Sequence, residues 1–161
     1  MVSDIYWIET PPGLRLATMA RPRAGDWLED EIDHWSRQGV GRVVSLLEPH
    51  EVHELGLEAE AALCAARSID FVSYPIADRG TPDDTRSAVR LARRILDDGT
   101  PTAIHCRAGI GRASLIAGAV LVTAGMASET AWAAIAKARG LPVPDTEVQR
   151  LWLANLTPDE N

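Results

Sequence analysis

Several features that mark whole classes of protein are scarce in this sequence. Its 161 residues include two cysteines, Cys64 and Cys106, which are too few for a disulfide framework or a structural zinc site. Neither an internal repeat nor a low-complexity segment occurs. The first residues lack the basic and apolar regions of a secretory signal, and the longest apolar run, 113–127, is too short to span a bilayer. We therefore expect a cytoplasmic protein without a membrane segment.

Basic residues are also in the minority. Lys and Arg together number 16 against 23 Asp and Glu, so the formal net charge is −7. This balance argues against binding to nucleic acid or to an anionic membrane surface. Hydrophobic residues make up 46% of the chain. Since a domain of this size buries roughly 70% of its unfolded surface, it needs no metal or disulfide to fold. We expect a single domain over residues 1–161, and a monomer.

The sequence does show a regular alternation of strand and helix patterns. Strands are predicted at 5–8, 14–17, 40–47, 69–76 and 102–105. Helices are predicted at 26–38, 50–67, 81–98, 112–124, 128–139 and 146–156. Such alternation predicts the α/β class, with a central, mostly parallel β-sheet flanked by helices. In these sheets ligands bind at the carboxyl ends of the strands, often at a helix N-terminus.

Three of the predicted helices carry boundary signals. Asp26 is expected to cap the first helix. Thr81 is expected to cap the helix at 81–98, with Pro82 at its first position and Asp84 at the capping-box position. Gly56 predicts a possible break in the helix at 50–67.

One connection combines a strand end, two glycines and a helix start. It reads His105-Cys106-Arg107-Ala108-Gly109-Ile110-Gly111-Arg112. The backbone N–H groups of such a loop can point at one centre, and its glycines permit the close turns that this requires. The dipole of the following helix and the planar fork of Arg112 both favour phosphate oxygens. We therefore predict that the loop, from Arg107 to Arg112, binds a phosphate group or another oxyanion between a strand and a buried helix.

Cys106 lies at the centre of this predicted anion site. An ordinary thiol has a pKa of about 8.5, and helix N-termini and neighbouring arginines lower such values by several units. We therefore expect Cys106 to be a thiolate nucleophile that attacks phosphorus and forms a phosphocysteine. His105 is expected to orient the loop through a hydrogen bond to backbone; the alternative is a packed core histidine. The alternative for Cys106, a small buried residue beside a plain turn, is disfavoured by the spacing of His, Cys and Arg.

The segment HCRAGIGR resembles the HCX5R signature of the cysteine-dependent protein phosphatases, and the chain length resembles their small dual-specificity group. Two further segments, PIADRGTPD at 75–83 and VVSLLEP at 43–49, are similar to the cyclin-dependent-kinase-associated phosphatases. The resemblance covers residues 40–153. It implies a protein-tyrosine or dual-specificity phosphatase, a phosphomonoester hydrolase that works through a cysteinyl-phosphate and needs neither metal nor cofactor. Its partner would be a phosphoprotein or phosphopeptide.

The resemblance also places a general acid at Asp78, just after a predicted strand. A carboxylic acid on a mobile loop across a cleft can protonate the leaving oxygen, and can later deprotonate the water that cleaves the phosphocysteine. The other interpretation of Asp78 is a simple turn cap. Asp83 and Asp84 are rivals, but both are predicted in the first turn of a helix, where the dipole favours carboxylates anyway.

The sequence departs from the family pattern at two places. A Ser or Thr normally follows the loop arginine, but here that position is Ala113, and Ser114 lies about 100° further around the helix. We therefore predict slow breakdown of the phosphoenzyme. Larger members carry a Gln-Thr pair that positions water. In the matching stretch the first Gln is replaced by Asp145, whereas Gln149 fits the second; a capping box with Thr146 also accounts for Gln149.

Three alternatives remain open at this point. Arg107 favours substrates with a second anionic group, which suggests a phosphoinositide or inositol-phosphate phosphatase, unless it simply pairs with an acid. Ala113 favours a phosphopeptide-binding pseudophosphatase. Cys64 is expected in the core, with a protective disulfide to oxidised Cys106 as the alternative. Rhodanese-like or arsenate-reducing chemistry also uses a cysteine loop, but it does not explain Asp78.

Overall fold

A computed structural model of the chain describes residues 2–158. Its single sheet contains β1 (Ile5–Trp7), β2 (Leu16–Met19), β3 (Arg42–Ser45), β4 (Asp70–Ser73) and β5 (Thr102–His105). The strands lie in the order β1-β2-β5-β3-β4, in which β1 is antiparallel to β2 and every other neighbouring pair is parallel. The predicted class, a mostly parallel α/β sheet, is confirmed.

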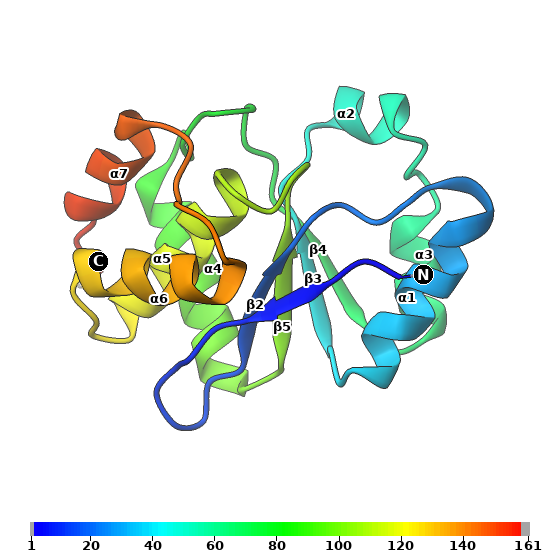
Figure 1. Cartoon of the computed structure of the whole chain (residues 1–161), viewed down its shortest axis with the longest axis horizontal. Helices are drawn as coiled ribbons and strands as arrows, with labels where there is room; N and C mark the ends of the chain where they lie inside the picture. Colours follow the sequence, from blue (N-terminus) through cyan, green and yellow to red (C-terminus); the bar gives the residue numbers. More distant parts are fainter. Residues whose placement is uncertain (1, 159–161) are drawn as a thin grey trace.

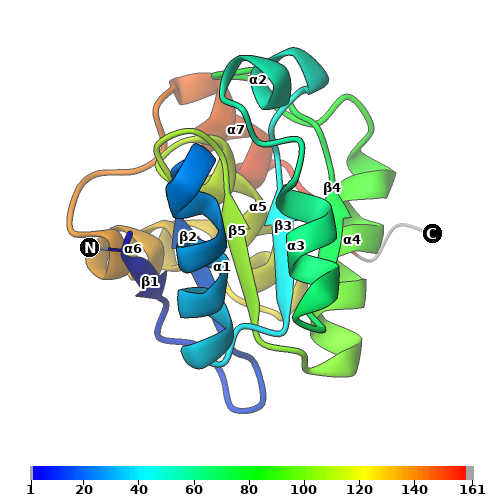
Figure 2. The same cartoon turned by 90° about the vertical axis from the view of Figure 1, so that its right-hand side faces the viewer.

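Helices cover both faces of this sheet. They are α1 (Leu28–Arg37), α2 (Pro49–Glu54), α3 (Glu60–Ala66), α4 (Thr85–Asp98), α5 (Arg112–Thr123), α6 (Ser128–Arg139) and α7 (Glu147–Ala154), with a 3-10 turn at Gly25–Trp27. One face of the sheet carries α1 and α3, and the other carries α4, α5, α6 and α7 (Figures 1 and 2). The short helix α2 lies at one end of the sheet instead of on a face (Figure 1).

The central strands β2, β3 and β5 are buried along their whole length, because both of their faces are covered. Two apolar clusters result, one on each face. The predicted buried helix, α5, belongs to the first cluster, and ten of its residues are buried. A helix that is apolar all round can be satisfied only in such a central position. The burial of α5 fixes its start against the end of β5.

Some predicted boundaries differ from the structure. The helix at 81–98 begins only at Thr85, because Asp84 is its N-cap and accepts a hydrogen bond from the backbone N–H of Arg86 at 3.0 Å. Thr81 and Pro82 therefore belong to a loop. Asp26 makes no capping bond and lies within the 3-10 turn. The predicted strands at 40–47 and 69–76 shorten to β3 and β4, since only four residues of each pair with a neighbour.

The break that Gly56 predicts is confirmed. Gly56 has a φ of +67° and separates α2 from α3. This break turns α2 toward the carboxyl ends of the strands, where Ser45 and Met19 are both paired with His105. The loop after β5 leaves the sheet at the same edge. Within the described residues, no helix is long and apolar enough to cross a membrane.

Candidate active site

The loop between β5 and α5 is wrapped tightly against β2. Gly109 has a φ of +74°, and a Cβ at that position would lie 2.6 Å from the carbonyl of Met19. Only glycine fits there, because both the conformation and the close approach exclude a side chain. The backbone N–H of Arg21 also donates to the carbonyl of Arg107 at 3.0 Å. The glycine-dependent turn that the sequence predicts is therefore present.

A pocket of about 230 Å³ opens above this loop. It is lined by Asp78, Arg79, Cys106, Arg107, Ala108, Gly111, Arg112 and Asp145. The structure thus brings together Cys106, Arg112 and Asp78, which the sequence predicts as a catalytic set. Gly109 and Ile110 belong to the same loop but do not line the pocket.

The guanidinium of Arg112 is buried and held in a fixed orientation. Its Nη1 donates to Glu51 Oε1 at 2.7 Å and to the Ile76 carbonyl at 2.9 Å, and its Nη2 donates to Glu51 Oε2 at 3.0 Å. Its Nη2 also lies 3.3 Å from Asp78 Oδ1. Burial alone would lower the pKa of Arg112, but the hydrogen bonds to Glu51 and the electrostatic interactions with the neighbouring Cys106, Glu51 and Asp78 outweigh it and raise that pKa. The site therefore holds a permanent cation beside the thiol.

Glu51 is the functional residue that the sequence analysis missed. Its carboxylate is buried and binds both Arg112 and the Nε of Arg107, the latter at 2.7 Å. Burial tends to raise its pKa, but hydrogen bonds from Arg112, the backbone of Glu48 and Arg107 lower it to about 2. The available signal was local: Glu48-Pro49-x-Glu51 has the spacing of a capping box, and the structure confirms that box at the start of α2.

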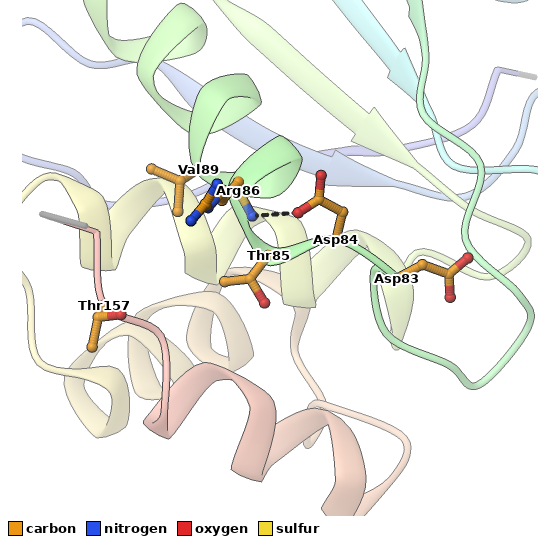
Figure 3. A pocket seen from close by; sticks show the side chains of 6 residues that line it. All are labelled: Asp83, Asp84, Thr85, Arg86, Val89 and Thr157. Carbon is orange, nitrogen blue, oxygen red and sulfur yellow. Dashed lines mark hydrogen bonds between the residues drawn. The ribbon is translucent and has the colours of Figure 1, made fainter. Parts of the chain in front are cut away.

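Asp78 lies on the loop that leaves β4, and its side chain is 62% exposed. Its rivals Asp83 and Asp84 lie elsewhere. They line a separate hollow of about 440 Å³ at the start of α4, where the Asp84 carboxylate is turned toward the backbone of Arg86 (Figure 3). This hollow is larger but contains neither the thiol nor the buried arginine. Both rivals also precede the helix, so their predicted place in its first turn is wrong.

Arg107 is paired with acids, which is one of the two interpretations of its role. Its guanidinium contacts Glu51 and, at 3.1 Å, Glu54, while its side chain remains 42% exposed. The loop carbonyl of Ala108 also accepts a hydrogen bond from Arg139 Nη2 at 3.2 Å. Acidic side chains thus hold Arg107, and a basic side chain holds Ala108; both of these residues line the pocket.

His105 is fully buried and lies between the loop and α3. Its Nδ1 is 3.3 Å from the carbonyl oxygen of Cys106, which agrees with the predicted backbone contact. Its Nε2 is 2.7 Å from Glu60 Oε2, a carboxylate that is itself buried. No sequence pattern points to Glu60, because α3 packs on the face of the sheet opposite to α5. The pair anchors the end of β5 where the loop begins.

The position after the loop arginine lacks a hydroxyl, as the sequence indicates. Ala113 is fully buried, and the Oγ of the neighbouring Ser114 is buried without a hydrogen-bond partner among the described residues. Ser114 therefore does not replace the missing group. Cys64 and Cys106 are both free thiols that belong to the two different apolar clusters. Burial and the nearby Glu60 raise the pKa of Cys64 to about 12, which fits a core residue.

One group of side chains has the spacing of metal ligands. Glu48, His50 and Glu51 each offer an atom within 4.8 Å of the others. The carboxylate of Glu51 is already bound by two arginines, so it is not free to act as a ligand.

Asp145, which lies just before α7, completes the pocket lining, and Gln149 lies in the first turn of that helix. Asp145 reaches over the loop, so that a Cβ on Gly111 would lie 2.2 Å from its Oδ2. Gln149 forms the predicted capping box with Thr146. Its Nε2 also donates to the carbonyl of Gly80 at 3.1 Å, which the sequence did not predict.

A protein-family profile described as "Polymorphic toxin system, DSP-PTPase phosphatase" matches residues 17–126. The matched segment includes Asp78, Cys106 and Arg112 but ends before Asp145. No curated protein matches the sequence.

Several solved structures share the fold. Kinase-associated phosphatase (KAP), with a serine in place of its catalytic cysteine, gives a TM-score of 0.83 at 20% identity over 95% of this chain and 93% of that one. A mutant form of Tk-PTP gives 0.74 at 25% identity over 92% of this chain and 93% of that one. PTPMT1 in complex with PI(5)P gives 0.73 at 19% identity over 93% and 94%, respectively. The sheet and its helices are thus those of a small dual-specificity phosphatase.

Proposed function

The chain belongs to the DSP-PTPase phosphatase family of polymorphic toxin systems, and on that premise we propose that it hydrolyses phosphomonoesters through a cysteinyl-phosphate. One observation supports this mechanism most directly. A single pocket holds a thiol, a buried arginine and an exposed carboxylate, which are Cys106, Arg112 and Asp78. We also propose that one catalytic domain extends over residues 1–161.

In the first step the Sγ of Cys106 attacks phosphorus, and the bond from phosphorus to the ester oxygen breaks. Asp78 gives its proton to the leaving oxygen. Arg112 and the loop N–H groups stabilise the charge on the three remaining phosphoryl oxygens, so no metal ion is needed for that purpose. Before substrate binds, Asp78 lies 3.3 Å from Arg112 Nη2. A bound phosphoryl group would compete for that atom and release Asp78 toward the leaving group.

In the second step water attacks phosphorus, the S–P bond breaks and inorganic phosphate leaves. Glu51 contributes by orienting Arg112, since it holds two of its nitrogens. His105 holds the carbonyl of Cys106 and thereby the start of the loop. Both act as positioning residues, because neither lines the pocket.

The proposed substrates are phosphotyrosine peptides, with activity on phosphoserine and phosphothreonine. The fold of PTPMT1, seen with PI(5)P, keeps phosphoinositides and inositol phosphates as the alternative. The phosphoinositide and inositol-phosphate alternative requires Arg107 to be a free cation. Since Glu51 and Glu54 neutralise Arg107, the structure offers less support for it.

Hydrolysis of an aryl phosphate in the presence of a chelator tests the mechanism. We expect turnover by the wild type, a loss of about 10⁴–10⁶-fold in kcat for Cys106→Ser, and a loss of about 10²–10⁴-fold for Asp78→Asn. Asp83→Asn is the matched control, because Asp83 lies on the same connection but outside the pocket. Its activity should equal that of the wild type.

Two outcomes would contradict this proposal. Activity that survives in Cys106→Ser would exclude the thiol mechanism. A folded wild type that binds phosphate or a phosphopeptide without turnover would indicate the pseudophosphatase, and Ala113→Ser would then be the first variant to make. Parallel assays with a phosphotyrosine peptide and an inositol phosphate would decide the substrate class.

A further inference from the structure

We propose that Asp145 is the general base of the second step and activates the water that cleaves the phosphocysteine. This inference rests on the proposed cysteinyl-phosphate mechanism and divides its proton transfers between two carboxylates. Asp78 would serve the leaving group, and Asp145 would serve water.

The first argument is the position of Asp145. It lines the pocket together with Cys106 and Arg112, although it comes from the segment that precedes α7. Its Oδ2 occupies the space in which a Cβ of Gly111 would lie, 2.2 Å from the ideal Cβ position. Gly111 is the N-cap of α5 and is directly followed by Arg112. The carboxylate therefore lies over the last turn of the phosphate-binding loop.

The second argument concerns the partners of the Asp145 carboxylate. Among residues 2–158, no side chain or backbone group makes a hydrogen bond or ion pair with the Asp145 carboxylate. Asp78, in contrast, is paired with Arg112 at 3.3 Å. Both oxygens of Asp145 can therefore accept a hydrogen bond from water, as a general base must do.

The third argument is that the backbone of Asp145 is held firmly. Gln149 is fully buried, and its Oε1 accepts hydrogen bonds from the backbone N–H groups of Asp145 at 3.2 Å and of Thr146 at 3.3 Å. The Nε2 of the same amide donates to the carbonyl of Gly80, two residues after Asp78. One side chain therefore fixes the loops that carry both carboxylates, and we assign Gln149 as a positioning residue.

The proposed step balances as follows. Asp145 takes a proton from water while the water oxygen forms a bond to phosphorus. The S–P bond breaks, and its electron pair returns to Sγ as the thiolate. No oxidant, reductant or further reactant is involved. Because Ala113 provides no hydroxyl to assist the departing thiolate, this chain depends more strongly on an effective attack by water.

Rapid mixing of the full chain with an aryl phosphate tests the assignment. In Asp145→Asn we expect kcat to fall about 10²-fold, whereas kcat/KM, which reports only the steps through phosphocysteine formation, stays within about threefold of the wild type. After a burst of one aryl alcohol per enzyme, the steady phase should be slower than in the wild type, because the phosphoenzyme breaks down more slowly. A structural role would not separate the two constants in this way. Asp83→Asn again serves as the control.

A conservative variant separates a base from a merely structural residue. Asp145→Glu keeps a carboxylate at this position, so we expect it to recover part of the kcat that Asp145→Asn loses. An unchanged kcat in Asp145→Asn overturns the assignment, as does an equal fall in kcat and kcat/KM, which would place Asp145 in the first step. A wild type without turnover would instead overturn the proposed function itself.

Discussion

The two ends of the sheet each bury an arginine among carboxylates. At the amino end, Arg42 opens β3 and is 3% exposed. At the carboxyl end, Arg112 opens α5 and is 2% exposed. Both guanidiniums have two acidic partners, which are Asp70 and Asp98 for Arg42 and Glu51 and Asp78 for Arg112. The two sites are therefore alike in the burial of the arginine and in the number of its acidic partners.

The difference lies in which nitrogens the acids occupy. Arg42 donates from Nε to Asp70 at 2.9 Å and from both Nη atoms to Asp98, so all three nitrogens are used. Arg112 is fixed from behind by the buried Glu51, while the partner on the pocket side, Asp78, is exposed on a loop. The two sites also differ in the buried acid. Glu51 is 2% exposed, whereas the two partners of Arg42, Asp70 and Asp98, are 41% and 45% exposed.

Exchange of each arginine for lysine would break this comparison most clearly. In Arg112→Lys we expect aryl phosphate turnover to fall about 10³-fold or more, because an ammonium cannot bind Glu51 and a phosphoryl group as a planar fork does. In the matched variant Arg42→Lys, turnover per folded molecule should be unchanged. The measurement is kcat/KM for both variants at equal folded fraction. Similar losses in the two would show that Arg112 only supports the fold.

Removal of the buried acid would sharpen the comparison through stability. Glu51→Gln leaves Arg112 buried without its counter-charge, and we expect a loss of about 3–5 kcal/mol in the free energy of unfolding. Asp70→Asn at the other end should cost about 1 kcal/mol, since that partner is well exposed and solvated. Urea titrations of both variants provide the values.

The same pair makes stability depend on acid pH. The pKa of Glu51 falls from its ordinary value of 4.5 to about 2 on folding. Its contribution is therefore complete above pH 4.5 and is lost as the pH falls toward 2. The difference in unfolding free energy between wild type and Glu51→Gln should shrink over this interval. A difference that stays constant would mean that the Glu51 pKa is not lowered in the folded protein.

Arg107 gives the smallest expected effect and tests the role of exposure. It shares Glu51 with Arg112, but its side chain is 42% exposed. We expect Arg107→Ala to change kcat/KM for an aryl phosphate less than about threefold, and stability by less than about 1 kcal/mol. A much larger fall for an inositol phosphate than for an aryl phosphate would show that Arg107 binds a second anionic group.

The sequence predicts those features of the fold and the site that a short run of neighbouring residues determines. The loop from Cys106 to Arg112 combines its glycines, arginine and helix start in seven consecutive residues, and the uniform apolar pattern of α5 predicts that this helix is central. The role of Asp78 depends on the resemblance to the phosphatase family, and the position of Asp78 just after a predicted strand agrees with that role. All three predicted catalytic residues meet in one pocket.

The parts that could not be predicted depend on distant contacts. Glu51 lies 61 residues before Arg112, and Glu60 lies 45 residues before His105, so no local spacing relates them. Thr81 and Pro82 form a good local helix start, but the helix begins at Thr85, with Asp84 as its N-cap. There the bond from Gln149 to Gly80 holds the preceding segment as a loop, and a tertiary contact outweighs a local preference.

The bond from Gln149 to Gly80 also joins two parts of the chain that the family match separates. The segment matched to the family ends at residue 126, so Asp78 and the loop from Cys106 to Arg112 lie within it, whereas Asp145 and Gln149 lie beyond it. A substitution of Gln149 would therefore act on both sides of this boundary, because it would release the backbone of Asp145 and the carbonyl of Gly80 near Asp78.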